Sequence, residues 1–485
     1  MPWSRVRATG ILLLGLPLLF ACATAVISPE DESEYGVEMS HQVENQIGLY
    51  NDAELTQYVS SVGQRLVNSL GETPYTFHFA IVDQFEPNAF ASMGGYIYVS
   101  RGLLAGMNDE MDLAGVLAHE IGHVTLRHHV RQAGRSMGAG LLTLPGRAVG
   151  VFSEGLGNMI NAPIEAAGEV FLASYSRSQE TEADDYGLRL AAAAGYDPHG
   201  LAHALHSIER TVAQLTGEEH EASFFDSHPT TPTRLADIST QITAIPLAIT
   251  LPLASREQLY KQLDGLWWGQ QNPQGGVFSK ATYLNADMDF TIAFAPDWKT
   301  INTPRFVGAS QPDGGAYIAL GSTQSELEFE QLGDALTAKM RKQTGLEPSE
   351  RRSFLIGNWP AQLIRYDDNS GSEKVSLYHL FVDSPHSTFT VMAMGLERYE
   401  AQLRETVESL RQLNSSERAS IQGQRLRLAQ IRPGESISSF NRRVANQWPV
   451  DLTAILNGTE AEAQENTSQT LKIMRTEHYR TQGKR

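Results

Sequence analysis

The stretch VLAHEIGHVTLRHHV, residues 116–130, places four histidines and one glutamate within fifteen positions. Upstream, Asn108 and Asp109 are both suitable N-cap residues, and acidic side chains cluster in the first turn. From Leu113 to Val124, apolar residues recur at helical spacing. We therefore expect a helix over residues 109–131, and the chemistry of this helix decides how the rest of the chain is interpreted.

Two of the histidines are spaced to share one ligand. His119 and His123 are four residues apart, so they lie about 40° from each other around a helix axis and can aim at one point. Glu120, beside the first histidine, is in the position of a base that acts on a metal-held water, as in the H-E-x-x-H arrangement. His128 and His129 lie about 140° and 240° further round than His123. We expect these two to lie on a solvated or basic helix end.

A catalytic zinc needs three protein ligands and one open position, so a third ligand must come from elsewhere. The segment SYSRSQETEADDYGLRLAAAAGYDP, residues 174–198, contains strong helix formers, and Glu180 and Asp184 would face one side of that helix while Glu182 points away. H-E-x-x-H followed by E-x-x-A-D at 180–184 resembles the HtpX and CAAX-prenyl-endopeptidase family of zinc metallopeptidases.

The resemblance implies roles for these two acidic residues. Glu180 would be the third ligand of one zinc ion per chain, and Asp184 would orient a ligand histidine. In the mechanism that the family implies, zinc and Glu120 together activate a water that cleaves a peptide bond. A solvated helix face is the alternative interpretation of this acidic run.

Two further stretches fit the same family. Asn88, Ala89, Phe90 and Ala91 resemble a strand beside the cleft that pairs with an extended substrate; the alternative is a plain edge strand.

The stretch FFDSHPTTPTRL, residues 224–235, resembles an H-P-x-x-x-x-R element. His228 would approach the zinc as a latch that keeps the site shut, or it would be structural. Arg234 would stabilise an oxyanion or pair with an acid.

The first residues are typical of an exported lipoprotein. Residues 1–21 combine two arginines with an apolar run and read as a signal peptide, and Leu-Phe-Ala-Cys resembles the lipobox, which makes Cys22 the lipidation site. Cys22 is the only cysteine. The resemblance implies a periplasmic protein that its lipid anchors to the outer membrane. The formal charge of −18 argues against nucleic-acid binding.

The 485 residues are too many for one hydrophobic core. We expect an α+β protein: a mainly helical zincin-type metallopeptidase domain with a small sheet, then an α+β module and a small LysM-like module. The predicted parts are a signal peptide (1–21), a linker (22–35), the peptidase domain (36–250), a connector (251–277), an α+β domain weakly resembling PsbP/Mog-like modules (278–414), a LysM-like module (424–475) and a tail (476–485).

Some of these parts leave alternatives open. The glycine-rich residues 134–165 are either a mobile lid or a packed hairpin. Trp267 and Trp268 are expected to pack in a core. Residues 278–414 show no constellation of catalytic residues, so we expect a binding or scaffolding domain. The LysM-like module either binds peptidoglycan or is a structural cap.

The function implied by the resemblance is that of a zinc metalloendopeptidase. Its substrates would be unfolded or misassembled envelope proteins, which fits envelope protein quality control. The alternative is a non-proteolytic envelope scaffold or chaperone with a latched or inactive zinc site, acting through its C-terminal modules.

Overall fold

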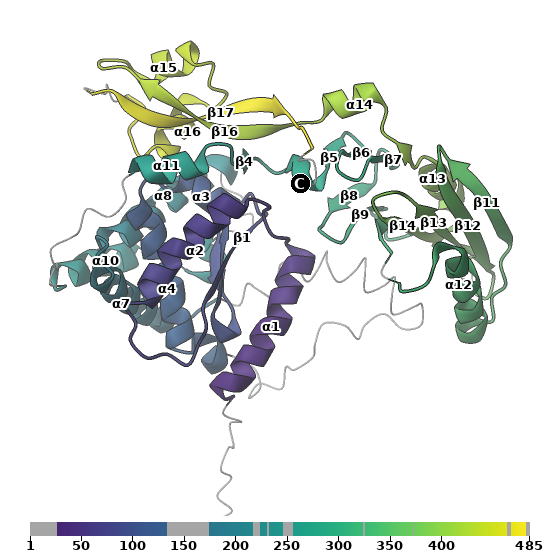
Figure 1. Ribbon diagram of the computed structural model, residues 1–485, viewed down its shortest axis with the longest axis horizontal. Coiled ribbons are helices and arrows are strands. Elements are labelled where there is room, and N and C mark those ends of the chain that lie inside the picture. The colour runs from purple at the N-terminus through teal and green to yellow at the C-terminus, as the bar shows by residue number, and fades with distance from the viewer. Residues whose placement is uncertain are drawn as a thin grey trace, which may run out of the picture.

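The computed structural model describes residues 27–132, 174–216, 224–229, 232–245, 256–323, 325–371, 373–462 and 467–481. The expected signal peptide, Cys22 and the expected lid or hairpin at 134–165 lie outside the described residues. Figure 1 shows the N-terminal helices on one side, the green α+β region on the other, and the yellow C-terminal strands across the top of the helices. Among the described residues, no helix combines the length and apolar character needed to cross a membrane.

The peptidase part is mainly helical with one small sheet. Strand β3 pairs with β1 in parallel and with β2 antiparallel, so β2 is an edge strand of the order β1-β3-β2. Its elements are α1 (Pro29–Gln46), α2 (Ala53–Val67), β1 (His78–Val82), β2 (Ala89–Ala91), β3 (Tyr96–Ser100), α3 (Arg101–Gly106), α4 (Glu110–Thr125), α7 (Arg177–Ala193), α8 (His199–Thr216), α9 (Phe224–Ser227) and α10 (Pro232–Thr243).

Helix α1 begins earlier than the sequence suggested. Ser28 caps it, accepting a hydrogen bond from the backbone of Asp31 in a capping box. Residues 29–35, which we expected to belong to a linker, are therefore the first turns of a helix. That helix packs against the turn before β3, where a Cβ on Gly36 would meet the carbonyl oxygen of Met93 at 2.3 Å.

Helix α4 begins where predicted and ends sooner. Asp109 is the N-cap, and it forms a capping box with Asp112. The helix ends at Thr125, and Arg127 has a left-handed φ of 56°, after which residues 128–132 are helical again. The expected single helix over 109–131 is therefore wrong after Thr125, because the chain turns at Arg127.

Glycines let two helices approach α4 closely. A Cβ on Gly115 would lie 2.4 Å from the backbone nitrogen of Leu201 in α8. A Cβ on Gly187 in α7 would lie 2.9 Å from the backbone nitrogen of His119. Close backbone approach of α7 brings the carboxylates of α7 within reach of the α4 histidines, so these small residues position the site.

The α+β region is built on antiparallel strands. A seven-stranded sheet has the order β11-β12-β13-β14-β10-β9-β8, and a second sheet has the order β15-β7-β6-β5. The elements are β5 (Val277–Ser279), β6 (Thr282–Asn285), β7 (Phe290–Ala293), β8 (Lys299–Asn302), β9 (Phe306–Ser310), β10 (Ala316–Ser322), α12 (Phe329–Thr344), β11 (Glu350–Ile356), β12 (Trp359–Asp368), β13 (Val375–Asp383), β14 (Thr388–Leu396), α13 (Glu400–Glu408) and β15 (Arg411–Gln412).

The C-terminal part is a βααβ unit that docks onto the peptidase helices. Its own elements follow the short helix α14 (Ser415–Ser420) and are β16 (Gln422–Ile431), α15 (Ile437–Arg443), α16 (Val450–Leu456) and β17 (Gln469–His478). Strand β4 (Trp267–Trp268), which follows α11 (Arg256–Leu263), extends this sheet to the order β17-β16-β4. Both tryptophans are buried, which confirms their predicted core packing. The mixture of helices and sheets confirms the α+β class.

A buried lysine joins the two parts. Lys472 of β17 is fully buried, and its Nζ donates hydrogen bonds to the carbonyl oxygens of Ala105 (2.8 Å) and Met107 (2.7 Å). These carbonyls lie at the C-terminal end of α3, where a helix leaves acceptors without intrahelical partners. Leu452 and Leu456 of α16 belong to the same hydrophobic cluster as the peptidase helices.

Candidate metal centre

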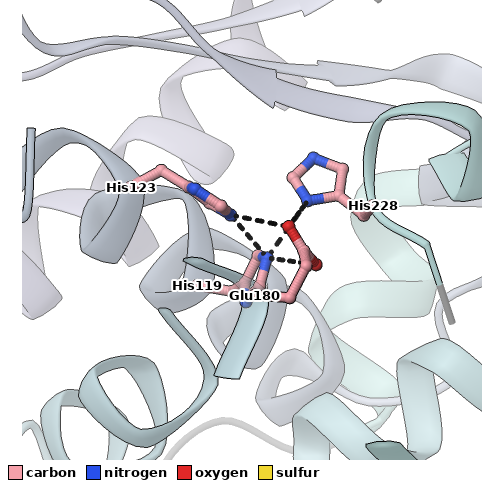
Figure 2. Close-up of side chains that lie close together, drawn as sticks. All are labelled: His119, His123, Glu180 and His228. Carbon is pink, nitrogen blue, oxygen red and sulfur yellow. Dashed lines mark hydrogen bonds and ion pairs between the residues drawn. The ribbon is translucent and has the colours of Figure 1, made fainter. Parts of the chain in front are cut away.

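Four side chains from three segments converge beside α4. His119 and His123 come from α4, Glu180 comes from α7, and His228 directly follows α9. One ligand atom of each lies within 4.8 Å of the others, and all four residues are buried. Figure 2 shows the three rings and the carboxylate pointing toward one another.

The spacing of the ligand atoms suits a small tetrahedral ion. Nε2 of His119 lies 3.0 Å from Nε2 of His123 and 3.2 Å from Nδ1 of His228. Oε1 of Glu180 lies 3.2 Å from Nδ1 of His228 and 3.4 Å from Nε2 of His123. Zinc bonds of about 2.0–2.1 Å in a tetrahedron place ligand atoms roughly 3.3 Å apart. These four of the six distances are therefore close to the spacing that zinc requires, and all six lie within 4.8 Å.

The protonation of the two α4 histidines also indicates a cation. Nδ1 of His119 lies 3.0 Å from Oδ1 of Asp184, a carboxylate that can only accept, so this nitrogen carries the proton. Nδ1 of His123 lies 2.8 Å from Nδ1 of His128. With its proton at Nδ1, His119 presents Nε2 as a lone pair that faces Nε2 of His123 and the Glu180 carboxylate. Imidazole nitrogen and carboxylate oxygen are a donor set of zinc, so this group of atoms suits a cation.

Arg234 of α10 holds the two carboxylates of α7. Its Nε and Nη2 donate to Asp184 at 2.8 Å each, and its Nη1 lies 2.7 Å from Oε2 of Glu180. Burial opposes ionisation of Asp184, but the hydrogen bonds from Arg234 and His119 lower the pKa of Asp184 below 3.8. Of the two roles left open for Arg234, pairing with acids is the one that these contacts favour.

Glu120 is a buried carboxyl group that no described residue satisfies. It is fully buried, and neither of its oxygens has a hydrogen-bond partner among the described residues. Its Oε1 lies 3.4 Å from Nε2 of His228. Burial raises the pKa of Glu120 above 4.5, so this carboxylate takes a proton more readily than an exposed glutamate. That property suits a group that accepts and returns a proton.

His228 faces both the ligand group and Glu120. Its ring stacks on Phe224, with centroids 4.4 Å apart and an interplanar angle of 12°. The backbone nitrogen of Tyr175 donates to the carbonyl oxygen of Ser227, which anchors the segment before His228. Phe224 in turn donates from its backbone nitrogen to the carbonyl oxygen of Pro87, next to β2. His228 therefore adds a fourth candidate ligand to the three expected from the sequence.

The expected cleft strand lies at the edge of the small sheet. Asn88, Ala89, Phe90 and Ala91 are all buried, and β2 pairs on one side with β3. The Oδ1 atom of Asn88 has no hydrogen-bond partner among the described residues. An edge strand and a buried amide oxygen that no described residue satisfies are features that an extended peptide could satisfy.

The prediction that His128 and His129 lie on a solvated or basic helix end is wrong for His128. His128 is fully buried against His123. His129 is half-buried, and its Nε2 lies 2.9 Å from the hydroxyl of Tyr175. The angles of about 140° and 240° hold only for a continuous helix, and the left-handed turn at Arg127 interrupts the helix.

Sequence reasoning also missed two aromatic side chains of the site. Tyr175 stacks on His123 with centroids 3.8 Å apart and an interplanar angle of 23°, and Phe224 packs on His228 as described. Both aromatic residues lie next to motifs that were recognised, which is a weak signal. Their contacts depend on how α7 and α9 pack against α4, which no spacing along the chain reveals.

Comparison with known proteins agrees with this geometry. Residues 53–242 match the model of peptidase family M48. Metalloprotease YcaL of Escherichia coli K12 is 30% identical over 189 residues, which cover 38% of this chain and 68% of that relative. The chain belongs to peptidase family M48. The predicted resemblance to zinc metallopeptidases is thereby confirmed.

Two other similarities extend less far. The beta-barrel assembly-enhancing protease of Escherichia coli K12 is 30% identical over 226 residues, 46% of each chain, so the match spans about half the length of that relative. The solution structure of cyanobacterial PsbP from Synechocystis sp. PCC 6803 aligns with 30% of this chain and all of its own at 9% identity and a TM-score of 0.23. That score supports no argument, and the PsbP-like character of residues 278–414 stays a prediction.

Proposed function

We propose that this protein is a zinc-dependent endopeptidase. The observation that carries the proposal is the convergence of His119, His123 and Glu180 on one point, with the unsatisfied carboxylate of Glu120 beside it. Relatives named as metalloproteases, among them YcaL, share the M48 region.

Each residue has a distinct task in this proposal. Nε2 of His119, Nε2 of His123 and the carboxylate of Glu180 would hold the zinc, which when bound polarises a scissile carbonyl and acidifies a water. Glu120 takes the proton of the attacking water and delivers it to the departing amine nitrogen. Asp184 keeps the proton of His119 at Nδ1, so that Nε2 stays available as a ligand atom.

We also propose that the arrangement is a latched one. Nδ1 of His228 lies with the three ligand atoms at the position that a catalytic site leaves open, and its Nε2 faces Glu120. A substrate carbonyl then cannot approach until His228 withdraws. The anchoring of Ser227 and Phe224 to neighbouring backbone supports this role, because it holds the histidine in place.

For the substrate we propose unfolded polypeptide. An extended segment can add to the free edge of β2 through main-chain hydrogen bonds, with Asn88 as an additional partner, and this requires no particular side chains. A folded protein does not offer such a segment. In the periplasm, with Cys22 lipidated and anchored to the outer membrane, the substrates would be misassembled envelope proteins; a relative named for β-barrel assembly is consistent with this.

A second candidate function is that of a non-proteolytic scaffold or chaperone. The observation that favours it is the position of His228, since a permanently bound fourth ligand would leave the zinc inert. The βααβ unit would then act as a LysM-like module on peptidoglycan. Pull-down of the whole protein by isolated peptidoglycan at varied salt tests that part, and consistent absence of binding would retire it.

Cleavage of casein separates the two candidates. The endopeptidase proposal expects cleavage that a chelator abolishes and added zinc restores. Glu120→Gln should retain about one zinc per chain and lose at least about 100-fold in rate, as expected for loss of a general base. Chelator-resistant cleavage, or wild-type turnover in Glu120→Gln, contradicts the proposed chemistry. Zinc binding without cleavage in both the wild type and His228→Ala favours the scaffold.

A further inference from the structure

His128, a buried histidine in contact with His123, has no role in the mechanism proposed above. His128 is fully buried, and its Nδ1 lies 2.8 Å from Nδ1 of His123. When Nε2 of His123 is a zinc ligand, as proposed above, its Nδ1 carries the proton. His123 is then the donor and Nδ1 of His128 the acceptor, which places the remaining proton of a neutral His128 on Nε2.

The surroundings of His128 fit that proton arrangement. Its Nε2 makes no hydrogen bond with a described residue, and it lies 3.5 Å from Oε2 of Glu182, a carboxylate that also binds Arg131 at 2.9 Å. The carbonyl oxygen of His128 accepts a hydrogen bond from Nε2 of Gln179 at 3.2 Å. Both contacts come from α7, the helix that also supplies Glu180.

The turn before His128 is held from a distant part of the chain. Arg127 has a φ of 56°, which a non-glycine residue rarely adopts without support. Its Nε donates to Glu32 of α1 at 2.7 Å, and Glu32 is itself buried. Without this turn, a continuous helix would carry His128 about 140° away from His123. A left-handed turn fixed by the ion pair of Arg127 with the buried Glu32 is what brings the imidazole of His128 against that of His123.

We propose that His128 is a positioning residue that fixes the Nδ1–H tautomer of His123 and aims its Nε2 at the zinc. This rests on the proposed function. In this arrangement, each of the two ligand histidines of α4 donates its Nδ1 proton to its own acceptor. His119 donates to Asp184, which Arg234 holds. His123 donates to His128, which Glu182 faces. Partners of this kind commonly contribute 10- to 100-fold to metal affinity.

The test compares two substitutions at one position. His128→Leu removes the acceptor and keeps comparable bulk, whereas His128→Asn keeps an oxygen where Nδ1 stands. We expect zinc affinity, measured in the full-length protein by competition with a chelating indicator, to fall about 10- to 100-fold in His128→Leu and to recover to within about fivefold of wild type in His128→Asn. The visible spectrum of the cobalt-substituted protein should change in His128→Leu alone. His129→Leu, which alters the neighbouring ring, should bind zinc within about threefold of wild type.

The outcomes distinguish this inference from the proposed function. Wild-type affinity in His128→Leu would overturn the inference while the zinc site stands. Equal loss in His128→Leu and His128→Asn, with an equal fall in melting temperature, would also overturn it, because it would show a purely structural role. Failure of the wild-type protein to bind zinc would refute the proposed function itself, and the inference with it.

Discussion

Replacement of Lys472 by methionine should release the C-terminal βααβ unit from the peptidase helices. The Lys472 ammonium group donates to two carbonyl oxygens at the end of α3, those of Ala105 and Met107. Methionine keeps the apolar stem and removes both donors. Two buried acceptors are then left unpaired, at about 1–3 kcal/mol each.

Part of the stability that Lys472→Met loses is regained. Burial lowers the pKa of Lys472 well below 10.5, which shows that the charged form is costly there, and methionine removes that cost. We therefore expect a net loss of about 2–4 kcal/mol for Lys472→Met. Lys472→Ala should lose more, because it also leaves a cavity in place of the stem.

Calorimetry tests this prediction by comparing the melting temperatures of the wild type and Lys472→Met. A chain of several cores need not unfold in one step, so the transition of the peptidase–C-terminal unit is followed by itself. A loss of 2–4 kcal/mol corresponds to a fall of about 5–15 °C in its melting temperature. Arg475→Met, an exposed position on the same strand, is the matched control and should move it by about 2 °C or less.

The pH dependence gives a second check on the same residue. A lysine whose pKa is depressed in the folded state binds fewer protons there than in the unfolded chain, so its contribution to stability grows as pH rises toward 10.5. The difference between wild type and Lys472→Met should widen in that direction. A Lys472→Met protein that melts with the wild type at every pH would show that the lysine does not join the two parts.

Three further predictions concern the site and its helix. His228→Ala should weaken zinc binding about tenfold or more yet raise casein cleavage when zinc is in excess, because the fourth ligand position opens; unchanged affinity and rate would remove the latch. Chelation of zinc should lower the melting temperature of the M48 region, since zinc at about 1,000 times its Kd stabilises by about 4 kcal/mol, and an unchanged calorimetric trace would argue against a bound metal. Burial raises the pKa of Asp112 to about 6, so ionising this carboxyl group costs up to about 3 kcal/mol of stability as the pH rises from 4 through 6. The melting temperature of Asp112→Asn should therefore exceed that of the wild type at pH 8 and not at pH 4. Equal melting temperatures at pH 8 would contradict this cost.

Local signals in the sequence were enough to predict where the key helices begin. Asp109 caps α4, and the H-E-x-x-H spacing places His119 and His123 on one face, as predicted. Glu180 and Asp184 share a face of α7 for the same reason. Such features depend on residues within one or two turns, so periodicity and capping preferences reveal them.

The features that the sequence did not reveal depend on residues far apart in the chain. Helix α4 ends early because Glu32, 95 positions before Arg127, holds the left-handed turn. His128 then becomes buried instead of solvated. Lysine is usually a surface residue, and only the contact of Lys472 with carbonyl oxygens more than 360 positions earlier explains its burial. Long-range pairing of this kind leaves no period or spacing in the sequence.

The charges of the site explain why these long-range contacts and a metal belong together. Three buried carboxylates, those of Glu120, Glu180 and Asp184, face one buried guanidinium, that of Arg234. An uncompensated charge of this kind is costly away from water. Burial opposes protonation of His228, yet the carboxylates of Glu120 and Glu180 raise its pKa above 6.5, so this ring supplies part of the missing positive charge. A divalent cation held by His119, His123 and Glu180 would supply all of it, so that His228 could remain neutral and withdraw without leaving the carboxylates unpaired. We therefore propose that His228 can leave the site without unpairing these carboxylates only while a metal is bound.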